Sequence, residues 1–132
     1  MEKKFLNPPG VAASPAYTHV VSVSGGKTIF ISGQVALDEK GNLVGRGDLR
    51  AQTKQVFENL GRALAAAGAG FEDVVKMTYY VVGYRAEQLP SIREARSEYL
   101  SRASPPASTL VGVEALFMDG VLIEVEAIAV VG

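Results

Sequence analysis

The most apolar stretch of the chain lies near its C-terminal end, over residues 121–131. Neighbouring side chains of a β-strand point to opposite faces, so alternate positions of this stretch share a face. One face is entirely apolar, whereas the other carries Glu124 and Glu126 among apolar residues. An ionised carboxylate that leaves water without partners costs several kcal/mol, or its pKa rises until it is neutral. The pattern predicts that a second subunit, a ligand or both cover the glutamate face; a mixed surface with both acids in water is the alternative.

The first half of the chain contains two strand patterns and one long helix pattern. Residues 17–24 and 28–32 flank Gly25-Gly26-Lys27, which predicts a β-hairpin with permissive turn residues. Asp48 is the predicted N-cap of a helix whose apolar residues recur at helical spacing until Gly68 ends it.

The second half predicts a strand over 74–82, a helix over 88–101, and two final strands over 107–116 and 121–131. The final strands are joined through Met118-Asp119-Gly120, in which Asp-Gly favours a tight turn. This order predicts an α+β fold in which a single mixed β-sheet carries two helices on one face. The helices then cover the apolar face of the last strand and leave its glutamate face uncovered.

Composition narrows the classes of function. The 132 residues predict one domain spanning 1–132, and no apolar run approaches the length of a membrane span. The absence of cysteine excludes disulfides and thiolate chemistry and is consistent with a cytoplasmic protein. A net charge of −1 argues against nucleic-acid binding, and the single histidine, His19, is expected in packing or at an interface.

Six segments, taken in order and at their spacing, resemble the motifs of one family. They are Pro15-Ala16-Tyr17-Thr18-His19, Ile31-Ser32-Gly33-Gln34, residues 52–60, Asp73-Val74-Val75-Lys76, Pro106-Ala107-Ser108-Thr109-Leu110-Val111 and residues 123–130. The family is the Rid (YjgF, reactive intermediate deaminase) family, also labelled L-PSP endoribonuclease. The resemblance implies a chorismate-mutase-like protomer and a homotrimer with a central β-barrel, with small-molecule clefts between subunits. It also implies hydrolysis of enamines and imines, such as 2-aminoacrylate and 2-iminobutanoate, to 2-keto acids and ammonia, without metal or cofactor.

The resemblance also implies a set of site residues. Tyr17, Ser32 and Glu124 occupy three positions that line the family's cleft, with the glutamate positioning or activating water. The family's deaminases hold the substrate carboxylate with an arginine, and that position is Ser108 here. A serine supplies no positive charge, so binding of a small 2-imino carboxylate should weaken by about one to two orders of magnitude. With Thr109, Ser108 is expected to form a neutral, hydroxyl-lined pocket.

Each site residue also has a purely structural interpretation. Glu124 is either a general base with a raised pKa or a glutamate bonded to backbone amides or a neighbouring subunit. Glu126 is favoured as structural, in a pair between subunits. Tyr17 is either a ligand contact or an amphipathic residue at the rim, and the Ser32 hydroxyl either contacts ligand or satisfies a backbone group.

Three functions follow from these interpretations. The first is a deaminase-type hydrolase acting on a substrate that is neutral or differently charged. The second is a non-catalytic protein that binds a small metabolite or regulatory ligand in the same cleft. Ribonuclease activity is the least supported, because the sequence has no basic stripe.

Overall fold

The computed structural model describes residues 1–101 and 103–132. Its elements, in chain order, are β1 (Glu2–Leu6), β2 (Val20–Ser24), β3 (Lys27–Gln34), α1 (Leu49–Ala66), the 3-10 helix η1 (Phe71–Asp73), β4 (Val74–Val82), the 3-10 helix η2 (Ala86–Gln88), α2 (Leu89–Arg96), β5 (Ala107–Val113) and β6 (Ile123–Val131).

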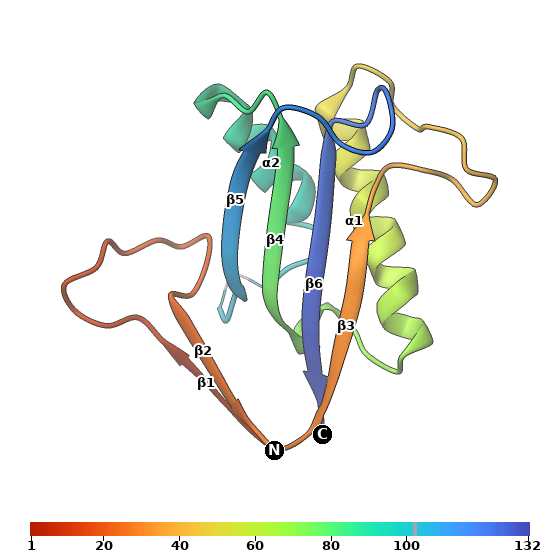
Figure 1. Ribbon diagram of the computed structural model, residues 1–132. Helices are drawn as coiled ribbons and strands as arrows, with labels where there is room; N and C mark the ends of the chain where they lie inside the picture. The colour runs from red at the N-terminus through yellow and green to blue at the C-terminus, as the bar shows by residue number, and fades with distance from the viewer. Residues whose placement is uncertain (102) are drawn as a thin grey trace.

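The main sheet has four strands in the order β3-β6-β4-β5. Strand β5 runs parallel to β4, and the other neighbours are antiparallel. Both α-helices lie behind this sheet, on the same face, as Figure 1 shows. The predicted α+β fold, with a mixed sheet and two helices on one face, is confirmed.

The core lies between the helices and the sheet. Alternate residues of β6, from Ile123 to Ala129, are buried and point to the helices. From α1, Phe57 and Leu60 meet them, and both side chains are fully buried. The opposite residues of β6 face away from the helices, so the predicted assignment of its two faces is correct.

The predicted hairpin around Gly25-Gly26 is wrong in its pairing. Strands β2 and β3 both form, but β2 pairs with β1 in a separate two-stranded sheet. Gly25 and Gly26 have φ of 73° and 81°, values that favour glycine. There the chain turns sharply, and the β1–β2 ribbon diverges from the main sheet (Figure 1).

The second predicted turn, at Asp119-Gly120, does not join neighbouring strands either. Gly120 has φ of 84°, as a turn requires, but β4 lies between β5 and β6. The chain therefore crosses over β4 instead of forming a hairpin. Helix α2 ends at Arg96, earlier than predicted, because the chain continues as turns in which Tyr99 N–H donates to the Arg96 carbonyl.

The start of α1 is fixed by a side-chain cap. The Asp48 carboxylate accepts a hydrogen bond of 3.0 Å from the Ala51 N–H. Asp48→Ala should therefore lower the free energy of unfolding by about 0.5–2 kcal/mol, the usual cost of losing such a cap. Urea denaturation would measure this loss, and Asp48→Asn, which keeps an acceptor, should lose much less. Equal losses in both variants would contradict a capping role.

Candidate functional site

The face of the sheet without helices carries both acids of β6. Glu124 lies opposite Tyr80 of β4, and Glu126 lies opposite Thr78. The Tyr80 hydroxyl donates a hydrogen bond of 2.7 Å to Glu126 Oε1. This bond, more than burial and the nearby carboxylates, raises the pKa of Tyr80 and keeps it protonated as the donor. Glu126 thus has a partner within its own chain.

Glu124 lies against the backbone of β3. The pairing of β3 with β6 shifts register between Ile31 and Gln34, so Ser32 and Gly33 form an irregularity beside the two acids. A Cβ atom at Gly33 would overlap the carboxylate of Glu124. Glycine at this position therefore makes room for the acid.

The environment of Glu124 disfavours its ionised form. Partial burial raises the pKa of this carboxyl, and the negative charge of Glu126 raises it further. Among the described residues, neither a cation nor a hydrogen-bond donor offsets these two effects. A carboxyl with a raised pKa is suited to exchange protons near neutral pH.

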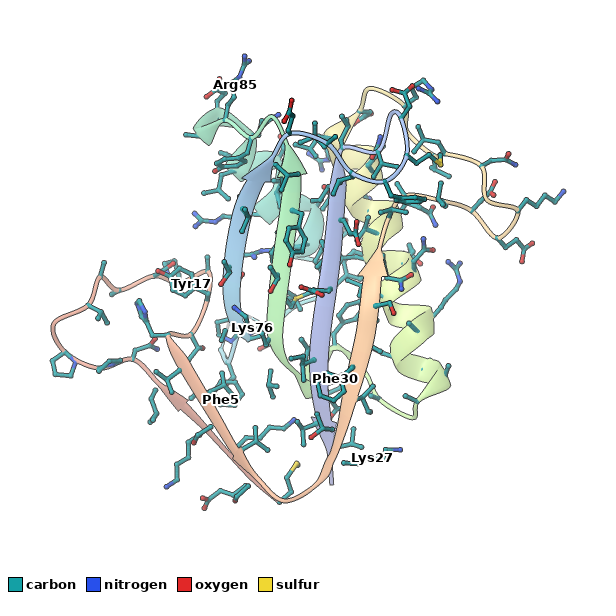
Figure 2. The ribbon with its side chains drawn as sticks, viewed as in Figure 1. Phe5, Tyr17, Lys27, Phe30, Lys76 and Arg85 are labelled. Carbon is teal, nitrogen blue, oxygen red and sulfur yellow. The ribbon has the colours of Figure 1, made fainter. Side chains whose placement is uncertain are left out.

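A cavity of about 360 Å³ on the same face is lined in part by Glu126, whereas Glu124 is not among its lining residues. Phe30 and Ser32 of β3, with Lys76 and Thr78 of β4, contribute to its lining. Phe30 is 76% exposed. Figure 2 shows Phe30 and Lys76 at the lower half of the sheet, on the face opposite the helices. This face therefore combines acids, a lysine and an exposed aromatic ring.

A second cavity, of about 240 Å³, lies at the β5 edge of the sheet and on its helix side. It is lined by residues of the loop before β2, of β4 and the turn after it, of α2 and of β5, namely Ala16, Tyr17, Tyr79, Tyr84, Leu89, Ile92, Arg93, Arg96, Ser108 and Leu110. Tyr17 lies on the loop that leads into β2 (Figure 2). Its ring packs edge-on against His19 at 5.0 Å between centroids, and His19 Nε2 is 2.6 Å from the Ala12 carbonyl.

Ser108 and Thr109 do not share a pocket, contrary to the sequence-based expectation. Consecutive residues of β5 point to opposite faces. Ser108 lines the helix-side cavity, whereas Thr109 accepts a hydrogen bond of 2.7 Å from Lys76 Nζ on the other face. The hydroxyl-lined pocket predicted from the pair is therefore wrong for a single protomer.

The predicted site residues fall into two groups in one protomer. Glu124, Ser32 and Thr109 belong to the helix-free face, and Tyr17 and Ser108 to the helix-side cavity. Ser108 lines the helix-side cavity, whereas Glu124 lines none of the four described cavities.

For three contributors to these surfaces, Gly33, Tyr80 and Arg96, sequence reasoning did not identify the partners. Gly33 and Tyr80 are visible only through the pairing of distant strands, which the local pattern does not encode. For Arg96 the sequence does contain a signal, because a charged residue within the apolar stripe of α2 indicates a side chain with a specific partner. Its guanidinium bonds the buried Tyr79 hydroxyl at 3.1 Å and the Ala16 carbonyl at 3.0 Å.

The described residues contain no group of three or more histidine, cysteine, aspartate or glutamate side chains placed to share a metal ion. Within residues 1–101 and 103–132, neither α-helix has the length and apolar character needed to cross a bilayer.

Comparisons with known proteins agree with one another. The family profile described as Endoribonuclease L-PSP matches residues 9–131. A RutC family protein of Pyrococcus horikoshii is 37% identical over 118 residues, covering 89% of this chain and 90% of that protein. The 2-iminobutanoate/2-iminopropanoate deaminase of Mus musculus is 37% identical over 121 residues, covering 92% of this chain and 85% of the enzyme.

A solved structure of a conserved Rid family protein from Yersinia pestis superposes on this one with a TM-score of 0.89. Its sequence identity is 36%, and the match covers 99% of this chain and all of that one.

Proposed function

Because the chain belongs to the endoribonuclease L-PSP family, which is the YjgF/Rid family, we propose that it hydrolyses an imine, an enamine or a related small metabolite. Glu124 acts as the base that activates the attacking water. The observation that carries this role is the raised pKa of a carboxyl that lies beside the Gly33 backbone, where no cation of the described residues offsets the shift. Neighbouring relatives named as deaminases support the reaction class.

The active site is proposed to form between subunits of a homotrimer. The division of the candidate residues between the sheet face and the β5 edge supports this arrangement. An edge of one protomer that meets the helix-free face of the next would bring Ser108 and Tyr17 near Glu124 of a different copy. The exposed Phe30 on that face is consistent with a contact surface.

Recognition of the substrate differs from that in deaminases that carry an arginine on β5. Ser108 of this chain offers a hydroxyl without charge to anything bound beside β5. We therefore expect slow turnover of 2-iminobutanoate, whose binding in those deaminases depends on a bidentate grip of its carboxylate. The preferred substrate is one whose binding does not require a guanidinium at position 108.

This proposal predicts a gain of function. Ser108→Arg should raise turnover of 2-iminobutanoate by about tenfold or more, because a charge-assisted, bidentate contact contributes roughly 1.5–3 kcal/mol. The assay generates the imine in the reaction mixture with an amino-acid oxidase and follows keto-acid release above the spontaneous rate. Thr109→Arg, on the opposite face of the same strand, is the matched control and should give no gain.

Two results would contradict the proposal. If the wild-type protein turned over 2-iminobutanoate as fast as an arginine-bearing relative, Ser108 would not limit the reaction. No turnover of any imine or enamine by either wild type or Ser108→Arg would favour the alternative, a non-catalytic protein that binds a metabolite. The absence of an arginine at position 108 is the observation that favours this alternative, and a thermal-shift ligand screen would reveal binding without conversion.

A further inference from the structure

The cavity beside Ser108 contains positive charge. Arg93 and Arg96 of α2 both line it. They also line an adjoining cavity of about 220 Å³, which Ser97 and Ser101 help to form. Neither lining includes an aspartate or glutamate among the residues that the structure describes. Two guanidinium groups thus border a pair of small cavities without an acid between them.

Protein contacts fix one of these guanidinium groups in place. Arg96 is partly buried, and it donates to the Tyr79 hydroxyl and the Ala16 carbonyl while its Cζ lies 5.6 Å from the centre of the Tyr79 ring. Both acceptors are neutral, since burial raises the pKa of Tyr79. A guanidinium has five N–H donors, so this arrangement orients Arg96 without using all of them.

The acids Glu94 of α2 and Glu98, which follows this helix, form ion pairs with α1. Glu94 forms an ion pair of 2.9 Å with Arg50, and Glu98 forms one of 3.6 Å with Lys54. Both basic partners belong to α1. Within the described part of the chain, neither Arg93 nor Arg96 makes an ion pair. Arg96 is partly buried and Arg93 is exposed, and guanidinium groups that have no counter-ion among the described residues favour binding of an anion.

The remaining walls of the cavity indicate what kind of anion fits. Leu89, Ile92 and Leu110 contribute apolar surface, and Tyr17 and Ser108 contribute hydroxyl groups. A volume of about 240 Å³ suits a small molecule only. A planar carboxylate matches the fork of an arginine, and a short hydrocarbon chain matches the apolar wall.

We propose that Arg93 and Arg96 form an anion site that holds the carboxylate of a small organic acid, with the positive charge supplied by α2 instead of β5. The proposal rests on the proposed use of this cavity for a metabolite, but it does not depend on turnover. The carboxylate then lies toward α2, with Ser108 and Tyr17 as neutral donors beside it. This location distinguishes the site from one built on an arginine of β5.

Calorimetric titration with 2-oxobutanoate tests this site, because that probe carries a carboxylate and contains no hydrolysable imine. The wild-type protein should bind 2-oxobutanoate and should not bind 2-butanone, its uncharged counterpart. Arg93→Gln and Arg96→Gln should each weaken binding by about tenfold to a hundredfold, the range expected for a lost charge-assisted hydrogen bond. Arg96→Lys, which keeps the charge but loses the fork, should fall between wild type and Arg96→Gln.

Arg62→Gln is the matched control, because Arg62 is an exposed arginine of α1 that lines a different cavity. Its affinity for 2-oxobutanoate should equal that of wild type. Arg96 also donates a hydrogen bond to the Ala16 carbonyl, so the thermal unfolding of each variant must be measured as well. If Arg96→Gln proves unfolded, the exposed Arg93→Gln variant decides the test.

Four outcomes would overturn the proposal. They are undetectable binding of 2-oxobutanoate at millimolar concentration, equal binding of 2-butanone, unchanged affinity in Arg93→Gln, and tighter binding of inorganic phosphate than of 2-oxobutanoate. Charge-dependent binding without any imine turnover would instead support this site while contradicting the proposed hydrolysis. The failure of one proposal is therefore distinguishable from the failure of the other.

Discussion

Glu124→Gln should reduce turnover by at least about 100-fold, because a positioned general base typically contributes two to four orders of magnitude. Glutamine keeps the shape of glutamate beside Gly33 but cannot accept a proton from water. The measurement is initial-rate kinetics with the best imine substrate, alongside the native mass and thermal unfolding of both proteins. Both variant and wild type should show the same assembly.

The direction of the Glu124 pKa shift predicts the pH dependence of the reaction. Burial and Glu126 raise the pKa of this carboxyl above its ordinary value of 4.5. The ionised form is the base, so the rate should fall as the pH drops through the raised pKa. Glu126→Gln removes the neighbouring charge and should move this fall in rate to lower pH, while retaining most activity at neutral pH.

Stability provides an independent check of the same shift. A carboxyl whose pKa is raised by folding contributes stability below its unfolded pKa and loses it as the pH rises through the folded value. Ionised Glu124 is therefore slightly unfavourable to the fold at neutral pH, and Glu124→Gln should unfold at the same or a higher temperature. Full activity in Glu124→Gln would remove this residue from the mechanism; loss of assembly would identify it as structural.

Phe57→Ala should lower the free energy of unfolding by about 3–5 kcal/mol, the usual cost of truncating a fully buried phenylalanine. Phe57 of α1 is completely buried. Its ring stacks against Phe71 at 5.9 Å and against Tyr99 at 5.3 Å between centroids, and it lies 6.4 Å from the ring of Tyr79. Its removal would leave a cavity between α1, η1, β4 and the turns that follow α2.

Denaturant unfolding at a fixed protein concentration measures this loss, since assembly would otherwise change the apparent stability. Phe117→Ala is the matched control, because the Phe117 ring is 73% exposed in the connection between β5 and β6. Its effect should stay within about 0.5 kcal/mol. A similar loss of stability in the two variants would show that the contacts of the Phe57 ring do not stabilise the core.

The elements that depend on local chemistry could be predicted from the sequence. Asp48 and Gly68 mark the two ends of α1 because capping and positive φ are properties of single residues. The faces of β6 followed from alternation alone. In contrast, Gly25-Gly26 and Asp119-Gly120 were assigned to turns correctly but to hairpins wrongly, because strand order depends on contacts between distant segments.

The candidate site could be predicted only in part for the same reason. Glu124 was identifiable as an acid in an apolar strand, and its raised pKa agrees with that expectation. The separation of Ser108 from Thr109 requires knowledge of which face of β5 meets α2. The position of Arg96 requires the fold as well, since the sequence alone does not bring residue 96 to Ala16, which lies 80 positions earlier.

The alternation of β5 has a consequence for how this family could vary its chemistry. Ser108 and Thr109 serve opposite sides of the sheet, so inserting one residue between α2 and β5 and sliding the strand by a single position would exchange them. Thr109 would then face the arginine-lined cavity, and Ser108 would take its place on the Lys76 face. The length of that connection, as much as the identity of its residues, therefore determines which hydroxyl a bound acid meets.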